Sequence, residues 1–215
     1  MPNTTKAHTR YYLNTGDTIP GVTTVLSILN KPGLVIWANR LGLEGIDSSK
    51  YRDKMADIGT IGHLMIMHHL NKTAPDLTGF SQQDIDIAEN CLLSYLEWEK
   101  GHKVEPMILE TPLSSDNYGY GGTPDFIGLV DGQVELLDFK TGKAIYNEYF
   151  YQLAAYRQLA SERGYKLNRA RILRIGRDEN EGFEERLIMK FDNEFKLFLH
   201  CLSIYNLLKT MKRSL

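Results

Sequence analysis

The residues best suited to chemistry are a few acidic side chains and one lysine in the second half of the chain. They are Glu110, the dipeptide Pro124-Asp125 and the tripeptide Asp138-Phe139-Lys140. In an extended strand, residues two apart point to the same face, so Asp138 and Lys140 are expected side by side. A carboxylate and an ammonium in an otherwise apolar strand are costly to desolvate unless they are paired or coordinated. The pattern therefore indicates either a buried ion pair or a site that holds a ligand.

A hairpin turn is predicted to bring another aspartate close to this pair. Asp131-Gly132 is a typical two-residue hairpin sequence, and Asp125 and Asp138 lie equally far from it on either side. The two aspartates are therefore expected nearly opposite each other in an antiparallel pair, within reach of one ion. Glu110, on the preceding predicted strand, would add a third carboxylate.

Such a group of oxygen atoms is typical of a site for a hard divalent cation. The carboxylates of Asp125, Asp138 and Glu110, together with the backbone carbonyl of Phe139, would suit Mg²⁺ or Mn²⁺. An ion of this kind neutralises a phosphate, lowers the pKa of bound water and stabilises charge on the attacked phosphorus. Lys140 would orient or deprotonate that water, because a desolvated lysine near a cation has a lowered pKa.

A purely structural interpretation of the same residues is a buried Asp138–Lys140 ion pair and an unrelated aspartate in a turn at position 125. The Gly-rich sequence before Asp125 and the upstream Glu110 favour the metal site over this interpretation. Zinc is not expected, because the chain's histidines and its two cysteines lack the spacing of a zinc site.

The elements that must position these residues change character halfway along the chain. Helical periodicity covers most of the first half, whereas strands and helices alternate in the second half. The expected helices span 34–43, 50–70, 81–100, 147–162 and 191–212, and the expected strands span 106–113, 123–130, 133–141, 170–175 and 185–190. This order is typical of an α/β or α+β domain.

The acidic residues and the lysine resemble the motif of the PD-(D/E)xK nuclease superfamily, specifically its RecB-type exonuclease branch. Gln152 and Tyr156 match the Gln-x-x-x-Tyr motif of that branch, and 59–63, Gly-Thr-Ile-Gly-His, resembles its Gly-Thr-x-x-His motif. The stretch 20–26, Pro-Gly-Val-Thr-Thr-Val-Leu, is similar to the opening of phage exonucleases and of the mitochondrial genome maintenance exonuclease. Gly21 stands where that opening usually has serine, and Met67 stands where the helix after His63 commonly carries an acidic residue.

The resemblance implies a restriction-endonuclease-like α/β fold, in which a mixed β-sheet core is flanked by helices beneath an N-terminal helical cap. Residues 1–215 would form a single nuclease domain, with 1–104 as the mainly helical cap region and 105–215 as the catalytic core. Asp125, Asp138 and Glu110 would hold Mg²⁺ or Mn²⁺, and His63 would approach the metal. Gln152 and Tyr156, on one helical face, would order the substrate and the strand that carries Lys140.

The implied function is a divalent-metal-dependent DNA exonuclease that hydrolyses phosphodiester bonds from strand ends, favouring single-stranded DNA, in recombination, repair or replication. Phage or host recombination and replication proteins are the expected protein partners. A structure-specific endonuclease that cuts flaps or junctions is a second possibility. A non-catalytic DNA-binding module on the same fold is a third, because a fold does not determine a function.

Two further features suggest contacts with DNA. Basic residues gather between Arg157 and Arg177, and we expect this run to follow the phosphates of the substrate. Tyr118 and Tyr120 flank a Gly-rich turn close to the acidic residues, and one of them is expected to stack on an unpaired base.

Composition is that of an ordinary globular chain. The 215 residues include 42% hydrophobic and 24% charged residues, with a formal net charge of −2, which excludes a disordered or strongly basic protein. Neither a membrane span nor a signal peptide is expected from the apolar runs or from the polar N-terminus. With its two cysteines far apart, a reduced intracellular protein is expected. The resemblance implies the cytoplasm of a bacterium or of a phage-infected cell.

Overall fold

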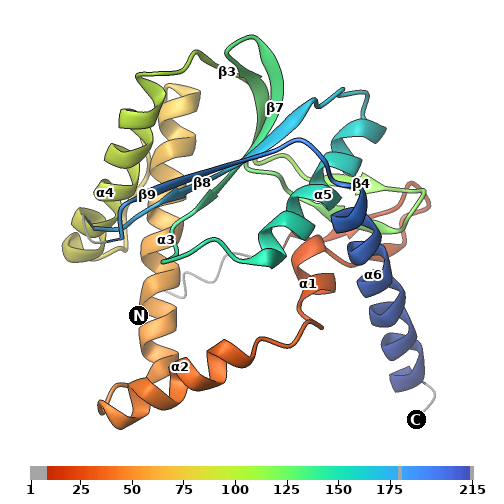
Figure 1. The fold of residues 1–215 in the computed structure, drawn as a ribbon, viewed down its shortest axis with the longest axis horizontal. Helices are drawn as coiled ribbons and strands as arrows, with labels where there is room; N and C mark the ends of the chain where they lie inside the picture. The colour runs from red at the N-terminus through yellow and green to blue at the C-terminus, as the bar shows by residue number, and fades with distance from the viewer. Residues whose placement is uncertain (1–8, 179–180, 214–215) are drawn as a thin grey trace.

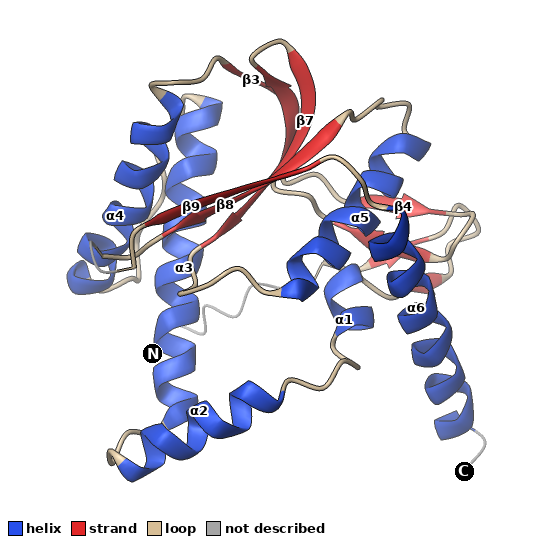
Figure 2. Cartoon of the chain, in the orientation of Figure 1, coloured by secondary structure: helices blue, strands red, loops and turns tan. Residues whose placement is uncertain are grey.

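The computed structural model describes residues 9–178 and 181–213. At its centre lies a five-stranded sheet with helices on both faces (Figure 1, Figure 2). In sheet order the strands are β3 (Val104–Leu109), β6 (Phe126–Val130), β7 (Gln133–Lys140), β8 (Arg169–Ile175) and β9 (Phe183–Ile188). Strands β7 and β8 are parallel, and the other neighbours in this sheet are antiparallel. The predicted fold class, a mixed sheet flanked by helices with a helical N-terminal region, is confirmed.

The hairpin between β6 and β7 has the tight turn that the sequence predicts. Asp131 and Gly132 both adopt left-handed backbone angles, with φ of 52° and 75°, as a two-residue type I′ turn requires. This turn sets a register in which Phe126 pairs with Leu137. Asp125, which precedes Phe126, is thereby brought level with Asp138, as expected.

Helix α5 (Asn147–Glu162) forms the connection from β7 to β8. Parallel neighbours need a long crossover, which is usually a helix. The helix predicted over 147–162 is therefore confirmed at both ends, and its place after β7 brings it onto one face of the sheet.

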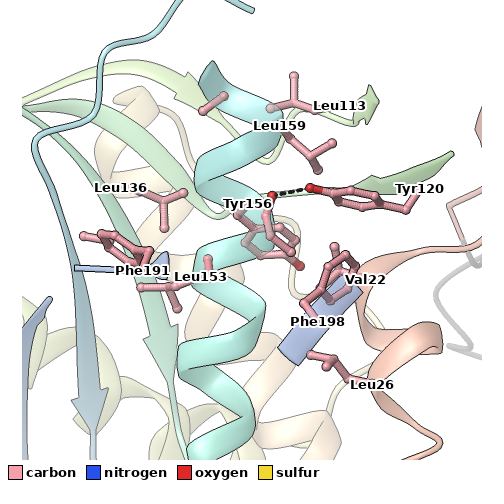
Figure 3. Close-up of a cluster of buried hydrophobic side chains, with 14 of the residues drawn as sticks. Val22, Leu26, Leu113, Tyr120, Leu136, Leu153, Tyr156, Leu159, Phe191 and Phe198 are labelled. Atoms are coloured by element: carbon pink, nitrogen blue, oxygen red, sulfur yellow. Dashed lines mark hydrogen bonds between the residues drawn. The ribbon is translucent and has the colours of Figure 1, made fainter. Parts of the chain in front are cut away.

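Alternation along β7 separates two hydrophobic clusters. Leu136 packs with α5, α1 (Val22–Leu26) and α6 (Asp192–Arg213) in the cluster shown in Figure 3. Leu137 and Phe139 belong to the cluster on the other face, with α3 (Ser48–Asn71) and α4 (Gln82–Glu99). Asp138 shares the face of Leu136 because side chains alternate along a strand.

The helical first half begins with α1, from which α2 (Pro32–Leu43) leads to α3 (Figure 1). The side chain of Asp47 accepts hydrogen bonds from two backbone N–H groups at the start of α3, and Ser81 accepts one at the start of α4. Such N-terminal caps satisfy backbone donors that have no partner inside the helix. The helices predicted over 34–43, 50–70 and 81–100 are confirmed, including Ser81 as the cap.

The strand expected over 106–113 is interrupted, and the one expected over 123–130 begins only at Phe126. Strand β3 ends at Leu109, and a separate strand, β4 (Leu113–Ser115), starts after Pro112, which has no N–H to donate to a ladder. Glu110 lies between the two strands with a left-handed φ of 40°. The break places this carboxylate just beyond the end of β3 rather than inside a strand.

Two short two-stranded sheets flank the main one. Strand β5 (Tyr120–Gly122) pairs with β4, and β1 (Tyr11–Tyr12) pairs with β2 (Thr18–Ile19). A parallel bridge between Gly21 and Gly121 joins the N-terminal segment to β5. The start of the described chain is thereby held against the strand end that leads to Asp125.

Helices long and apolar enough to cross a membrane are absent from the described parts of the chain. The polar N-terminus, from which the absence of a signal peptide is predicted, lies outside the described residues. Cys91 and Cys201 are both buried free cysteines.

Candidate metal centre

Three side chains from distant parts of the sequence converge beside the end of the sheet. The metal-binding atoms of His63, Glu110 and Asp125 all lie within 4.8 Å of one another. Nδ1 of His63 is 3.8 Å from Oδ2 of Asp125. Backbone pairing supports the two carboxylates, because the N–H of Glu110 donates to the carbonyl of Asp125 at 3.1 Å. Two of the predicted metal ligands and the histidine expected nearby are thus brought together.

The carboxylate of Asp125 is oriented by the neighbouring strand. Its Oδ2 accepts a hydrogen bond from the backbone N–H of Phe139, with an N···O distance of 2.9 Å. The predicted opposition of Asp125 to the Asp138–Lys140 strand is therefore present in the structure. The backbone carbonyl of Phe139, expected as a further ligand, stays a prediction.

Helix α3 carries His63, and two glycines of this helix allow it to pack closely against Thr141 and α4. A Cβ atom on Gly59 would lie 2.6 Å from Oγ1 of Thr141, just after β7, and one on Gly62 would lie 3.0 Å from Cβ of Cys91 on α4. The His63 ring then meets the ring of Phe139 edge to face, with centroids 6.1 Å apart. The glycines of the Gly-Thr-x-x-His-like stretch therefore serve the close approach of α3 to β7 and α4.

Asp138 and Lys140 form an ion pair directly behind this group. Lys140 Nζ lies 2.5 Å from Oδ2 of Asp138, whose side chain is only 1% exposed. Among the described residues, the buried Oδ1 of Asp138 has no hydrogen-bond partner. Burial raises the pKa of Asp138 to about 6, and the Asp125 charge acts in the same direction, whereas the Lys140 ammonium opposes the rise.

Lys140 keeps its proton in this arrangement. Burial alone would lower its pKa, but the attraction of Asp138 and Asp125 outweighs burial and raises the pKa above its ordinary value. The lowered pKa expected for Lys140 beside a bound cation stays a prediction, because the raised pKa is that of the protein without a metal ion. A protonated ammonium can orient water or stabilise negative charge, but it cannot accept a proton.

Gln152 and Tyr156 occupy the predicted shared face of α5. Nε2 of Gln152 donates to the hydroxyl of Tyr156 at 2.9 Å. The Tyr156 ring packs so tightly on Gly122 that a Cβ atom there would lie 2.5 Å from the ring. Burial raises the pKa of Tyr156, and the charges of Asp138 and Asp125 add to this effect. The tyrosine hydroxyl therefore stays protonated near the carboxylates.

A cleft of about 700 Å³ opens onto the metal-ligand group. His63, Glu110 and Asp125 line it, together with residues of the N-terminal segment, α3 and α6. The ion pair of Asp138 and Lys140 does not belong to its lining and lies behind Asp125. The arrangement has an accessible layer of ligands backed by a buried carboxylate–ammonium pair.

The donor set fits a divalent cation. The ligand atoms of two carboxylates and an imidazole lie within 4.8 Å of one another, and carboxylate oxygens are the ligands that Mg²⁺ and Mn²⁺ prefer. The buried Oδ1 of Asp138, without a hydrogen-bond partner among the described residues, is costly unless something positive approaches it. We therefore assign His63, Glu110 and Asp125, with Asp138 behind them, as the group that would hold the ion.

Of the two tyrosines predicted to stack on a base, Tyr120 is buried and Tyr118 lies outside the cleft. Tyr120 is completely buried in the cluster of Figure 3, where its hydroxyl donates to the carbonyl of Ala155 at 2.9 Å. Its proposed role in stacking on a base is therefore wrong. Tyr118 is 40% exposed, but it packs edge to face on Phe195 and does not line the cleft.

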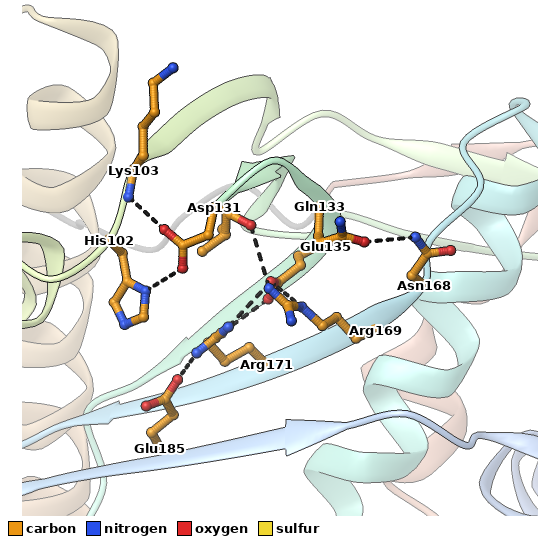
Figure 4. A network of polar contacts seen from close by, with 10 residues as sticks. His102, Lys103, Asp131, Gln133, Glu135, Asn168, Arg169, Arg171 and Glu185 are labelled. Carbon is orange, nitrogen blue, oxygen red and sulfur yellow. Dashed lines mark hydrogen bonds and ion pairs between the residues drawn. The ribbon is translucent and has the colours of Figure 1, made fainter.

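The basic run between Arg157 and Arg177 is mostly neutralised within the protein. Buried Glu135 on β7 pairs with Arg169 and Arg171, as Figure 4 shows. Three further ion pairs join arginines of this run to glutamates; they are Arg171–Glu185, Arg174–Glu184 and Arg177–Glu181. The expectation that this run follows substrate phosphates is wrong for these arginines, because their charges already have partners.

Arg157 does not reach the cleft either. Its guanidinium lies over the ring of Phe191, 5.1 Å from the centroid, and the residue does not line the cleft. The predicted contact between Arg157 and substrate is therefore wrong in this structure. The arginine covers the cluster around α5 instead.

Sequence reasoning missed the residues that line the cleft from the two ends of the chain. Arg10 and Tyr11 come from the N-terminal segment, and Tyr205 and Lys209 come from α6. The Tyr11 hydroxyl lies 2.9 Å from Oγ1 of Thr123, and the Tyr11 side chain occupies the space that a Cβ atom on Gly121 would fill. The pair of glycines at 121 and 122 was the available signal, because such residues mark close approach of other groups.

Comparisons with known proteins give structural matches but no sequence family. No family model matches the chain, and no curated protein matches it. Among solved structures, it is similar to an alkaline exonuclease, LHK-Exo, from Laribacter hongkongensis, with 14% sequence identity, a TM-score of 0.41, and coverage of 75% of this chain and 90% of that one. LHK-Exo in complex with dAMP is similar at 16% identity and a TM-score of 0.40, with the same coverage.

Proposed function

We propose that the protein is a divalent-metal-dependent DNA exonuclease that hydrolyses phosphodiester bonds from strand ends. The observation that carries the proposal is the convergence of His63, Glu110 and Asp125 on a cleft, directly in front of the Asp138–Lys140 pair. The same residues carry the resemblance to the PD-(D/E)xK motif. In addition, Gln152 and Tyr156 are hydrogen-bonded to each other on α5, and the negative charges of Asp138 and Asp125 act on Tyr156.

In this proposal, a Mg²⁺ or Mn²⁺ ion would polarise a phosphate oxygen and increase the acidity of a water molecule when bound. The hydrogen bond from the N–H of Phe139 already orients the Asp125 carboxylate, so its side chain would lose little conformational entropy when the ion binds. Lys140 would stabilise the negative charge that develops on the phosphate. It would also position the attacking water.

Asp138 would have two roles. It would hold Lys140 in place through the ion pair at 2.5 Å, and its Oδ1, which has no hydrogen-bond partner among the described residues, would help to hold the ion. Gln152 would order the substrate through its amide, while its hydrogen bond to Tyr156 fixes the amide's orientation. These residues would pre-arrange the site, which is the main way that enzymes stabilise charge in a transition state.

A preference for single-stranded DNA is part of the proposal. The cleft of about 700 Å³ beside the metal-ligand group is the space that would receive the strand. By the same resemblance, we place the activity in recombination, repair or replication within a bacterial or phage-infected cytoplasm.

The test compares cleavage of linear and circular single-stranded DNA. Both substrates, the linear one labelled at either end, are incubated with Mg²⁺, with Mn²⁺ or with chelator. Lys140→Ala is the inactive variant, and Lys100→Ala, an exposed lysine at the end of α4, is its matched control. Degradation of the linear strand alone, abolished by chelator and in Lys140→Ala but not in Lys100→Ala, is the expected result.

Other outcomes would redirect the proposal. Cutting of the circle would identify an endonuclease. Binding without cutting, in any of the three conditions, would mean that the fold serves as a DNA-binding module. Cleavage that persists in chelator would contradict a role for the metal.

A further inference from the structure

Helix α6 continues well beyond the part that packs on the body of the protein. Leu202 is its last buried residue within the described chain, yet the helix extends to Arg213. Figure 1 shows this C-terminal half leading away from the sheet. Its apolar side chains are largely exposed; they are Ile204, Leu207, Leu208 and Met211. Core packing therefore does not account for the length of α6, although most helical stability comes from such packing.

One face of this C-terminal half of α6 borders the cleft. Tyr205 and Lys209 are four residues apart, so they share a helical face, and both line the cleft that holds the metal-ligand group. From the opposite end of the chain, Arg10 lines the same cleft. The cleft therefore receives one basic residue from each end of the described chain.

These two basic residues differ from the arginines between positions 169 and 177. Among the described residues, neither Arg10 nor Lys209 has a carboxylate within ion-pair distance, whereas the arginines at 169, 171, 174 and 177 all have one. Lys209 is also exposed to solvent. Their charges are thus available to a ligand in the cleft.

The other groups of the lining suit a polyanion as well. A divalent ion would neutralise Glu110 and Asp125, leaving Arg10 and Lys209 as the charged side chains of the wall. Hydroxyl groups make up much of the remainder, including those of Thr9, Thr18, Thr23, Thr24, Thr60 and Thr123. Cationic and hydroxyl donors are the usual partners of phosphate oxygens in nucleic-acid complexes.

We infer that Arg10 and Lys209 bind the phosphodiester backbone of the strand whose scissile phosphate lies at His63, Glu110 and Asp125. This inference rests on the proposed function and adds the surface that holds the substrate. It replaces the run from Arg157 to Arg177 as the source of phosphate contacts. Because the contacts go to the backbone, they would be independent of base sequence.

The test uses Arg10→Gln, Lys209→Gln and the double variant in Mn²⁺-dependent cleavage of single-stranded DNA at several salt concentrations. Lys196→Gln is the matched control, because Lys196 is an exposed lysine of α6 that does not line the cleft. For each of the two residues, KM should rise several-fold with kcat unchanged. The slope of log(kcat/KM) against log salt should become shallower by about 0.7 per residue removed. Mn²⁺ affinity, measured by calorimetry without DNA, should not change.

The results separate failure of the inference from failure of the proposed function. If wild type cleaves DNA but both variants match Lys196→Gln in KM and in salt slope, the inference is wrong and the nuclease assignment stands. A loss of kcat without a change in KM or slope would also overturn it, because a strand-binding residue acts on substrate binding. If wild type neither binds nor cleaves DNA, both proposals fail.

Discussion

The backbone N–H of Phe139 donates a hydrogen bond to the carboxylate of Asp125, with an N···O distance of 2.9 Å across the β6–β7 pair. Asp125 is therefore oriented by main-chain geometry, which a side-chain substitution elsewhere cannot easily change. The strand that orients it also carries Asp138 and Lys140. One hairpin thus fixes the relative positions of three of the residues assigned to the site.

Removal of the Lys140 side chain should destabilise the metal-free protein. Lys140→Ala leaves Asp138, whose side chain is 1% exposed, without its cationic partner. Breaking a buried pair from one side costs roughly 3–5 kcal/mol. A divalent ion would supply positive charge near the same carboxylate, so Mn²⁺ should restore part of the lost stability. Thermal unfolding with and without Mn²⁺ measures both effects.

Lys100→Ala serves as the control for this experiment, because its ion pair with Glu97 is exposed and exposed pairs contribute little. Its unfolding temperature should stay close to that of wild type. Equal stability of Lys140→Ala and wild type without metal would show that the buried pair is not needed to compensate Asp138.

Two helical glycines should respond in opposite ways to replacement by alanine. A Cβ atom on Gly62 would lie 3.0 Å from Cβ of Cys91, whereas one on Gly42 in α2 would meet nothing within 4 Å. Gly42→Ala should therefore stabilise the protein by up to about 1 kcal/mol through helix propensity. Gly62→Ala should destabilise it by roughly 1–3 kcal/mol, because α3 and α4 must separate. Urea unfolding of both variants tests the pair.

The two variants also differ in what they should do to the metal centre. Gly62 precedes His63, so displacement of α3 should weaken Mn²⁺ binding in Gly62→Ala, while Gly42→Ala should leave it unchanged. Stabilisation of the protein by Gly62→Ala would contradict the close packing of α3 described above.

The arginine–glutamate network of Figure 4 should contribute to folding rather than to DNA binding. Glu135 is fully buried between Arg169 and Arg171. Glu135→Gln keeps its shape but removes the charge, so the free energy of unfolding should fall by roughly 3–5 kcal/mol. Glu105→Gln, on the exposed pair with Lys103, should have little effect.

The salt dependence of DNA cleavage gives an independent check on that network. At a temperature where Glu135→Gln is folded, its salt slope should equal that of wild type, since the paired arginines do not face the substrate. A shallower salt slope for Glu135→Gln than for wild type would indicate that these arginines contact the substrate.

The local arrangement of the site was predictable because it depends on short-range rules. The Asp131-Gly132 turn sets the register of its hairpin, and strand alternation puts Asp138 beside Lys140. The ends of α5 were also readable from its periodicity and flanking residues. In each case the relevant contacts lie within one or two adjacent elements.

The substrate contacts were not predictable by the same means. Whether Arg171 is free or paired depends on glutamates from β7 and β9, which no local pattern relates to it. Tyr120 looked available beside a Gly-rich turn, but α5 and α6 cover it completely. Arg10 and Lys209 line the same cleft only because the segment around Arg10 and helix α6 both border it. Tertiary packing decides all three.

The most direct measurement of the central claim is Mn²⁺ binding by calorimetry to wild type, Asp125→Asn and Asp86→Asn. Asparagine can still accept the hydrogen bond from Phe139, so Asp125→Asn should stay folded while it loses a charged ligand. Asp86 is an exposed aspartate of α4 and provides the matched control.

The account predicts that wild type and Asp86→Asn bind Mn²⁺ equally, while Asp125→Asn binds it more than ~100-fold more weakly. Loss of a residue that only supports a ligand already costs 10–100-fold, roughly, in metal affinity, and loss of a ligand should cost more. Equal Mn²⁺ affinity in Asp125→Asn and wild type, or no binding to wild type at all, would contradict the assignment of this site as a metal centre.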